Sequence, residues 1–325
     1  MISISPAPAL ADTASAMIDV LEAQRADFLA SGPASAATRI DRIDRGIDAL
    51  ITYADKLSEA INADFSCRPR EITLLTDVGA SIAPMKHARK HLNKWMKVQK
   101  REIEHSLYPG AKNRVIPQPL GVVGVIVPWN FPVQLAFTPL TYIFAAGNRA
   151  MVKMSENSIH LSRLLIKLVP DYFRPEKLSF FEETGTVGIL FSQLPFDHLL
   201  FTGSGATGKA VMASAAKNLT PVTLELGGKS PAVIAPDYPM QKAVERIMFA
   251  KIFNAGQVCV NVDYLFVSED RIEDFVAAAK SWVAKHCPDI NSPDYTSIID
   301  QRSFERLTDC LLYTSDAADD QWRVL

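Results

Sequence analysis

The stretch Gly121-Val122-Val123-Gly124-Val125-Ile126-Val127 decides the fold class, because it is a short, uninterrupted apolar run rich in β-branched residues. Such a run is typical of a strand that is buried on both faces of a sheet. Two further short runs, at residues 150–153 and 198–201, have the same character, and a loop and a helical pattern follow each of them. This alternation of strand and helix predicts an α/β fold with a mostly parallel sheet.

The N-terminal part of the chain has a helical pattern over about residues 37–100. Apolar residues recur there at steps of three and four, with charged residues between them: Ile40, Ile43, Ile47, Leu50 and Ile51. We therefore expect an N-terminal helical layer. Residues 86–101 hold seven Lys or Arg residues and no acidic residue. We interpret them as a helix with a solvated basic face rather than a patch for nucleic acid or lipid.

Two segments leave the pattern of the first sheet. Residues 101–119 are polar and contain Pro and Gly, which predicts an excursion from the sheet. Further along the chain, residues 222–225 and 231–235 have strand patterns, and a helical pattern follows over about residues 240–254. We therefore expect a second domain to begin at about residue 221.

The composition of the 325 residues excludes several classes of protein. With 48% hydrophobic residues and only 15 Gly, the chain is neither disordered nor a fibrous repeat. A net charge of −2 gives no general reason to bind nucleic acid or an anionic membrane. The sequence has no signal peptide pattern and no apolar stretch long enough to span a bilayer, so we expect a cytoplasmic protein. Its four cysteines are irregularly spaced, which fits a reducing compartment and argues against structural zinc. We expect no metal site.

Three residues beside Gly or Pro can carry chemistry together. Cys259 ends the segment Gly256–Cys259, Glu225 lies in Leu224–Pro231, and Asn130 lies in Pro128–Pro132. Gly and Pro allow sharp backbone turns that present a side chain to a cleft. A lone cysteine is more often a buried, inert residue, and a lone glutamate beside two glycines is more often solvated. As a set, however, they provide a nucleophile, a base and an oxyanion donor, which favours a covalent thiol enzyme.

These motifs, taken in order with Lys153–Glu156 and Phe201–Ser204, resemble the aldehyde dehydrogenase superfamily, including the 34-residue step from Glu225 to Cys259. Residues 70–75 and 87–92 look most like the class-3-like, coniferyl aldehyde dehydrogenase group. The resemblance implies a Rossmann-like NAD-binding domain with N-terminal helices over residues 1–220, in which 101–119 form part of an oligomerisation ribbon. It also implies an incomplete α/β catalytic domain over residues 221–325, and a homodimer for the intact relative.

The resemblance assigns a role to each residue of the set. The Cys259 thiolate would attack the aldehyde carbon, and the Asn130 amide with the Cys259 backbone N–H would hold the resulting alkoxide. A hydride would then leave for NAD, and a thioester would remain on the sulfur. Glu225 would take a proton from the water that hydrolyses the thioester, a task that requires partial desolvation of its carboxylate. We therefore expect Glu225 to be partly buried.

The cofactor residues need a choice between two interpretations. Residues 203–208 form a literal Gly-x-Gly-x-x-Gly motif, and the generic fingerprint would make Glu225 the ribose ligand. The resemblance instead assigns the adenosine ribose to Lys153 and Glu156. It assigns the pyrophosphate to Gly203 and Ser204 at a helix N-terminus. Trp129 is a further expected cofactor-binding residue. A 2′-phosphate would be repelled by Glu156, so we expect NAD rather than NADP.

Two alternatives stay open from the sequence alone. A dehydrogenase that passes its acyl group to coenzyme A is one, although such relatives generally lack the general-base glutamate. An inactive, truncated dinucleotide-binding fragment is the other, because only 66 residues follow Cys259 whereas members of the superfamily continue further. Residues 313–321 do not resemble that continuation, and we interpret them as a foreign or out-of-frame junction. The aldehyde itself is not specified beyond an aromatic substrate such as coniferyl aldehyde.

Overall fold

A computed structural model of the chain describes residues 10–319. The chain forms two compact units. The first unit holds residues 1–58 and 73–226, and the second holds residues 59–72 and 227–325. Across the described residues, none of the helices combines the length and the hydropathy that a bilayer-spanning segment needs.

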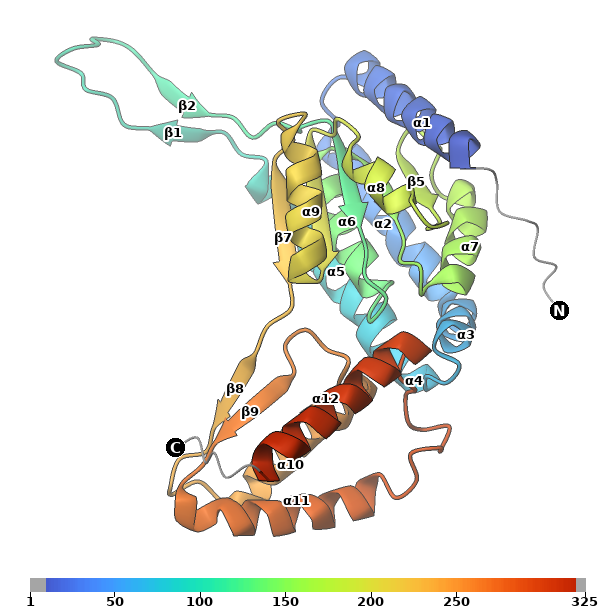
Figure 1. Cartoon of the computed structure of the whole chain (residues 1–325). Helices are drawn as coiled ribbons and strands as arrows, with labels where there is room; N and C mark the ends of the chain where they lie inside the picture. The colour runs from blue at the N-terminus through green and yellow to red at the C-terminus, as the bar shows by residue number, and fades with distance from the viewer. Residues whose placement is uncertain (1–9, 320–325) are drawn as a thin grey trace. The chain divides into compact units, whose positions relative to one another are not determined.

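A parallel sheet of five strands forms the centre of the first unit (Figure 1). Its order is β5-β4-β3-β6-β7, and every neighbouring pair is parallel. The strands are β3 (Val122–Ile126), β4 (Arg149–Lys153), β5 (Leu178–Phe181), β6 (His198–Gly203) and β7 (Val222–Leu226). All residues of β3 and β4 are buried, as the continuous apolar runs require. The predicted parallel α/β sheet is confirmed.

Helices cover both faces of this sheet. The chain moves from β3 to β5 in one direction and then crosses back to β6, so right-handed crossovers put α6 and α7 on one face and α8 and α9 on the other. Helix α1 packs against α8 and shares a core with it that includes Met17, Leu21 and Phe191. The helices are α1 (Leu10–Ser31), α6 (Gln134–Ala146), α7 (Ile159–Leu168), α8 (Val187–Ser192) and α9 (Gly205–Ala216).

The expected N-terminal helical layer is confirmed on the side of α6. Helices α2 (Ala36–Thr52) and α5 (Ala80–Trp95) pack against α6 and against each other. Ile43, Ile47 and Leu50 of α2 are buried, whereas Ile51 is exposed. Along the chain, α3 (Ala54–Phe65), α4 (Arg70–Thr73) and the π-helical segment η1 (Leu74–Gly79) come between α2 and α5.

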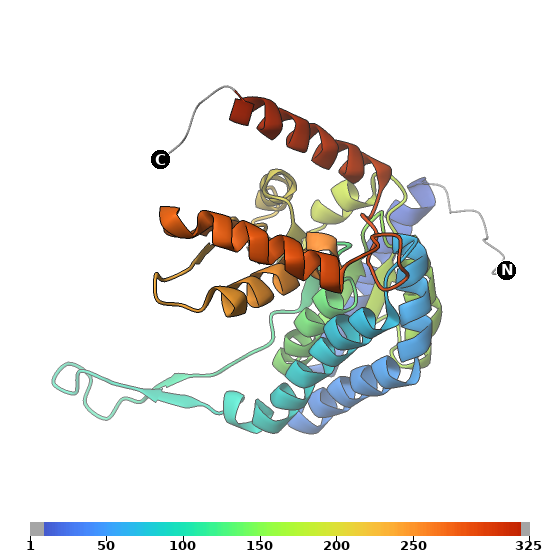
Figure 2. The same cartoon turned by 90° about the horizontal axis from the view of Figure 1, so that it is seen from below.

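An antiparallel hairpin extends away from the rest of the first unit (Figures 1 and 2). It consists of β1 (Gln99–Arg101) and β2 (Asn113–Val115), and all of their residues are exposed. The polar segment 101–119 therefore makes the predicted excursion from the sheet. Its role in oligomerisation stays a prediction.

The second unit contains a small parallel sheet and three long helices. Strands β8 (Ser230–Val233) and β9 (Val262–Phe266) pair with each other, and α10 (Met240–Ile252) packs against α11 (Ile272–His286). Helix α12 covers Gln301–Asp319. Short 3-10 turns complete the two units: η2 (Val169–Asp171), η3 (Phe253–Gly256) and η4 (Glu269–Arg271). The hypothesis of a foreign junction over residues 313–321 falls partly outside the described residues and stays untested.

The boundary between the units differs from the expected start of the second domain at residue 221. Strand β7 was expected to open that domain, but it pairs with β6 through Leu199–Val222 to Gly203–Leu226. These hydrogen bonds add β7 to the edge of the first sheet, and the compact units divide after Leu226.

Candidate active site

The carboxyl edge of the five-stranded sheet carries several predicted site residues. β3 and β6 are neighbours in this sheet, but the chain continues from β3 toward β4 and from β6 toward β7, on opposite sides. In open α/β sheets, ligands bind outside the carboxyl ends of the strands at such a switch point. Asn130 follows β3 here, and Gly203 and Ser204 follow β6. The topology therefore brings the predicted oxyanion donor and the predicted phosphate loop to one edge.

Asn130 lies in the half-buried loop between β3 and α6. Its side-chain Oδ1 accepts a hydrogen bond from the Phe131 backbone N–H at 3.1 Å. The acceptor end of the amide is thus held by the backbone. The nitrogen end is the one that an oxyanion would need as a donor.

The start of α6, directly after this loop, is fixed by a residue that the sequence interpretation missed. Asp77 Oδ1 accepts hydrogen bonds from the backbone N–H groups of Val133 at 3.0 Å and Gln134 at 3.2 Å. Asp77 is 0% exposed and lies in the π-helical segment η1. A buried carboxylate at a helix N-terminus satisfies donors that have no partner within the helix. Its sequence signal was a single acidic residue inside an apolar helical pattern.

Glu225 lies near the end of β7, opposite Thr202 of β6. The expectation of a partly buried Glu225 is wrong, because this side chain is exposed. Residues along β7 alternate between half-buried Val222 and Leu224 and exposed Thr223 and Glu225, so Glu225 lies on the exposed face of this strand. Its motif continues into the second unit, where a Cβ atom on Gly228 would lie 3.6 Å from the carbonyl oxygen of Cys259, an ordinary contact distance.

Cys259 lies in an exposed turn of the second unit, between η3 and β9. The thiol is therefore presented at a loop rather than packed in a core, as the sequence predicted. The backbone before it is unusual: Asn254, Ala255 and Gly256 have consecutive φ values of +52°, +52° and +77°. For a residue with a Cβ atom this left-handed region is strained, and such strain often lies at functional sites.

The Gln257 side chain holds this turn in place. Its Nε2 donates to the backbone oxygens of Asn254 and Ser297, both at 3.0 Å, and its Oε1 accepts from the Ile299 N–H at 3.0 Å. The turn that carries Cys259 is thereby tied to a segment 40 residues later in the chain. In the sequence, Gln257 stands out only as part of the segment Gly256–Cys259.

Lys153 at the end of β4 is almost fully buried and has an unexpected partner. Its Nζ lies 2.7 Å from Oε2 of Glu183, which follows β5. Glu183 also accepts hydrogen bonds from the backbone N–H groups of Gly185, Val187 and Gly188. Burial raises the pKa of Glu183, but the Lys153 charge and these donors outweigh it and hold the pKa below its ordinary value. Glu156, the expected partner in ribose binding, is exposed and accepts a hydrogen bond from Ser155 Oγ.

Gly203 and Ser204 form the junction between β6 and α9. Ser204 is the N-cap of α9, and its Oγ accepts the Thr207 N–H at 3.2 Å. Gly203 lies against a ring, because a Cβ atom there would be 2.5 Å from Cζ of Phe201. The junction therefore has the close backbone packing and helix N-terminus that suit an anion. Trp129 lies half-buried in the loop after β3.

The predicted cofactor residues and Asn130 end strands of one sheet or follow them, whereas Cys259 belongs to the second unit. Lys153 and Gly203 end β4 and β6, and Trp129, Asn130, Glu156 and Ser204 lie in the loops that follow β3, β4 and β6. Within the described residues, no group of three or more His, Cys, Asp or Glu side chains is arranged to hold a metal ion. The roles of these residues stay predictions. The geometry provides an exposed thiol, that of Cys259, on a turn held by Gln257. It also provides a parallel sheet whose carboxyl edge is of the kind that binds dinucleotides.

Comparison with known proteins gives these features a family. The model of the aldehyde dehydrogenase family matches residues 8–324. The coniferyl aldehyde dehydrogenase of Pseudomonas sp. (strain HR199 / DSM 7063) is 46% identical over 308 residues, which cover 94% of this chain and 62% of that protein. The probable coniferyl aldehyde dehydrogenase of Caulobacter vibrioides is also 46% identical, with 95% of this chain and 64% of that protein covered. The chain thus spans somewhat over three fifths of these relatives.

Solved structures have the same fold. The substrate-bound state of Staphylococcus aureus AldH superposes with a TM-score of 0.84 at 32% identity, over 91% of this chain and 64% of that one. The Mycobacterium tuberculosis aldehyde dehydrogenase complexed with NAD+ gives a TM-score of 0.79 at 27% identity, over 92% and 61%. With a family match over nearly the whole sequence and relatives at 46% identity, the chain belongs to the aldehyde dehydrogenase family.

Proposed function

We propose that this chain carries the dinucleotide-binding part and the nucleophile of an enzyme that oxidises an aldehyde to a carboxylic acid. The observation that carries the proposal is the exposed Cys259 on a turn that the Gln257 side chain clamps. A thiol in such a position is open to a carbonyl substrate, unlike a cysteine packed in a core. The family supports an oxidation as the reaction.

In the proposed reaction, the Cys259 thiolate forms a C–S bond with the aldehyde carbon, and the carbonyl oxygen becomes an alkoxide. Donors from the Asn130 amide and the Cys259 backbone N–H stabilise this charge. The acceptor for the hydride that leaves the carbon would be NAD, held by the residues at the carboxyl ends of β4 and β6. Glu225 takes a proton from water, which attacks the thioester and releases the carboxylic acid and the thiolate.

The cofactor is proposed to be NAD rather than NADP. Lys153 and Glu156 would hold the adenosine ribose, Gly203 and Ser204 the pyrophosphate, and Trp129 would line the site. Glu183, beside Lys153, adds a second carboxylate at the ends of β4 and β5. Because the Lys153 ammonium is already paired with Glu183, the exposed Glu156 carboxylate would leave negative charge at this edge and repel a 2′-phosphate. The M. tuberculosis neighbour is complexed with NAD+, which supports the choice.

The proposed substrate is an aromatic aldehyde such as coniferyl aldehyde, since relatives of that name are 46% identical to this chain. A homodimer is proposed through the exposed β1–β2 hairpin. We assign the protein to the cytoplasm, where the thiols of Cys67, Cys259 and Cys287, all free in this structure, stay reduced. Acyl transfer to coenzyme A is a weaker alternative, because Glu225 provides a base for hydrolysis.

A second candidate function is dinucleotide binding without turnover. It is favoured by the exposure of Glu225, because the proposed base then lacks the partial desolvation that its task requires. This candidate predicts saturable NAD binding and no formation of NADH.

One experiment separates these possibilities. The 325-residue chain is mixed with NAD and with coniferyl aldehyde, benzaldehyde or an aliphatic aldehyde, and the absorbance of NADH is followed. The variant Cys259→Ala is the control. NAD binding is measured separately by calorimetry. NADH formation that the control lacks supports the dehydrogenase. Binding without NADH supports the second candidate, and absence of both contradicts the assignment of the cofactor site.

A further inference from the structure

A basic pocket lies at the amino edge of the five-stranded sheet, opposite the edge of the proposed cofactor site. Its volume is about 410 Å³. Arg149, the first residue of β4, lines it, whereas Lys153 ends the same strand. At about 3.3 Å per residue, the two positions are about 13 Å apart along the strand. All residues of the pocket belong to the first unit.

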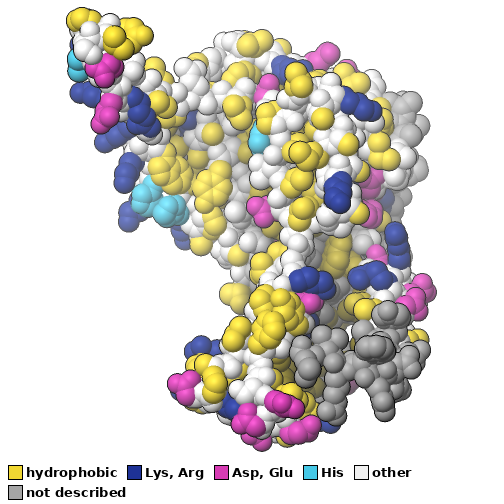
Figure 3. Space-filling model, turned by 60° about the vertical axis from the view of Figure 1, so that its left-hand side comes forward, with side chains coloured by type: hydrophobic (Ala, Val, Ile, Leu, Met, Phe, Trp, Pro, Cys, Tyr) yellow, Lys and Arg dark blue, Asp and Glu magenta, His cyan; other side chains and the backbone are white. Residues whose placement is uncertain are grey.

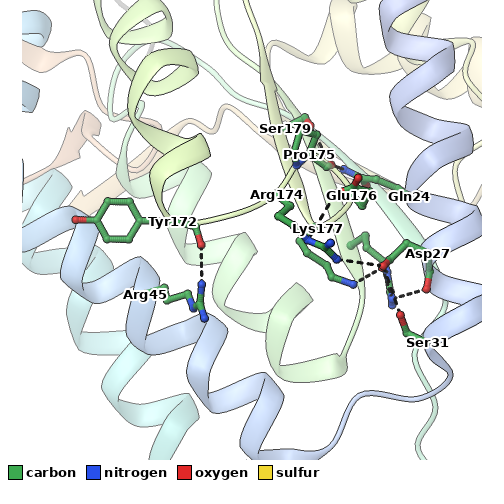
Figure 4. Close-up of polar contacts among 11 residues, drawn as sticks. Gln24, Asp27, Ser31, Arg45, Tyr172, Arg174, Pro175, Glu176, Lys177 and Ser179 are labelled. Atoms are coloured by element: carbon green, nitrogen blue, oxygen red, sulfur yellow. Dashed lines mark hydrogen bonds and ion pairs between the residues drawn. The ribbon is translucent and has the colours of Figure 1, made fainter.

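Five cationic side chains line this pocket: Arg42, Arg45, Arg149, Arg174 and Lys177. Three of them share one carboxylate, that of Asp27 in α1 (Figure 4). Arg149 donates to Asp27 Oδ2 from Nε at 3.0 Å and from Nη2 at 2.6 Å, Lys177 Nζ binds the same oxygen, and Arg174 lies 3.8 Å from Oδ1. One carboxylate cannot neutralise three cations.

The other charges around the pocket do not remove this excess. Arg45 pairs with Asp41 at 2.9 Å and donates to the Tyr172 backbone oxygen (Figure 4). Arg174 also lies 3.8 Å from Glu176. Arg42 is buried, and its Nη1 donates only to a backbone oxygen, that of Asn148, among the contacts described. Burial is the largest cause that lowers the pKa of Arg42, and the neighbouring Arg149 charge lowers this pKa further.

The buried Arg149 has a donor without use. Its side chain is 0% exposed, and Nη1 has no hydrogen-bond partner among the described residues. A buried unsatisfied donor is costly, and the cost is larger for a charged group. Arg149 is held by Asp27 and by the Phe28 ring, whose centroid lies 4.9 Å from Cζ, and one guanidinium nitrogen is left without a hydrogen bond beside the cationic pocket lining.

The N-terminus of α2 supplies further groups that suit an anion. Ser35 is its N-cap and lines the pocket together with Ser31 and Thr38. The helix has 17 residues, so its dipole and its first N–H groups favour negative charge at this end. Arginine forks, hydroxyl groups and a helix N-terminus are the donors that bind phosphate oxygens.

We propose that this pocket binds a small phosphate-bearing anion at a site separate from the catalytic edge. The ligand is inorganic phosphate or diphosphate, or the phosphate group of a small organic molecule, since all present the same oxygens to the arginines. Phosphate is favoured over a single carboxylate because the cations are in excess and a phosphate carries more charge and more acceptors.

The test is calorimetric titration of the full chain with inorganic diphosphate and, separately, with glycerol 3-phosphate at constant ionic strength. The variant Arg45→Gln/Arg174→Gln removes two cations whose side chains are 53% and 72% exposed, so the fold is kept. The buried Arg149 is left unchanged. The control Arg89→Gln/Arg114→Gln removes the same charge from exposed positions outside the pocket.

We expect saturable binding that weakens roughly tenfold or more in the pocket variant and changes little in the control. Tighter binding of diphosphate would identify the ligand as an inorganic phosphate, and tighter binding of glycerol 3-phosphate would identify it as an organic phosphate. Absence of saturable binding by the unmodified chain would overturn the proposal. So would equal weakening in both variants, or binding that the pocket variant retains in full, as expected for phosphate bound at Gly203 and Ser204.

Discussion

The five-stranded sheet of the first unit and the two-stranded sheet of the second unit differ in how deeply their strands are buried. β3 and β4 of the first unit are buried at every position, whereas the residues of β8 and β9 are half-buried or exposed. Val233 is 75% exposed, and Tyr264 and Phe266 are also exposed, so hydrophobic side chains gather on the surface over these strands (Figure 3). An exposed apolar sheet surface marks a place where more protein packs. The two central strands of the first unit are therefore fully covered, whereas the strands of the second unit keep apolar side chains on the surface.

The largest expected effect separates the chemistry of the two units. Cys259→Ala should lower aldehyde oxidation by at least roughly 10⁴-fold, since the nucleophile is lost, and should leave NAD affinity unchanged because the cofactor residues lie in the first unit. Steady-state NADH formation and calorimetric NAD titration check the two parts. A parallel loss of NAD binding would contradict the proposed division of labour.

The contrast in burial predicts a difference in stability. Met151→Ala removes a side chain that is 0% exposed in β4 and should destabilise the first unit by about 2–5 kcal/mol. Val233→Ala, at an exposed position of β8, should change stability by less than about 0.5 kcal/mol. Urea unfolding followed by far-UV circular dichroism measures both. Similar losses for the two variants would mean that β8 is covered in solution.

A smaller effect is expected at the loop that carries Asn130. Asp77→Ala leaves the buried N–H groups of Val133 and Gln134 without an acceptor, which should cost about 1–3 kcal/mol. Asp77→Asn keeps one acceptor oxygen and should lose less. Thermal unfolding ranks the two variants, and the same stability in Asp77→Ala as in the unmodified chain would show that this carboxylate does not hold α6.

The smallest expected effect is a pH dependence in the first unit. Because the pKa of Glu183 is lowered in the folded state, its contribution to stability is complete above the unfolded value of 4.5 and is lost as pH falls through the folded value. Glu183→Gln should therefore reduce stability at pH 7 and flatten the loss of stability below about pH 4.5. Unfolding curves between pH 3 and pH 7 test this. If the loss of stability with falling pH is the same in Glu183→Gln as in the unmodified chain, the Lys153–Glu183 pair does not cause that loss.

Local sequence patterns predicted the elements of the first unit well, because the spacing of apolar residues in each element reflects which of its faces is buried. The apolar run at 121–127 became β3, and the spacing of Ile43, Ile47 and Leu50 became the buried face of α2. The glycine and proline motifs located the loops that carry Asn130 and Cys259. Burial of Glu225 could not be predicted in this way, since its exposure depends on which face of β7 the fold leaves uncovered.

The sequence by itself determined the strand-helix alternation, the candidate nucleophile, base and oxyanion donor, and the family, because these depend on residue types and short spacings. Three contacts were decided only by the tertiary structure. Asp77 holds the start of α6. Glu183 forms the ion pair with Lys153, and Arg149 binds Asp27, which lies 122 residues away in the chain. Each of these contacts joins a charged side chain to a group that is far away in the chain. The physical reason is that a buried charge needs a partner, but the fold chooses which distant residue supplies it.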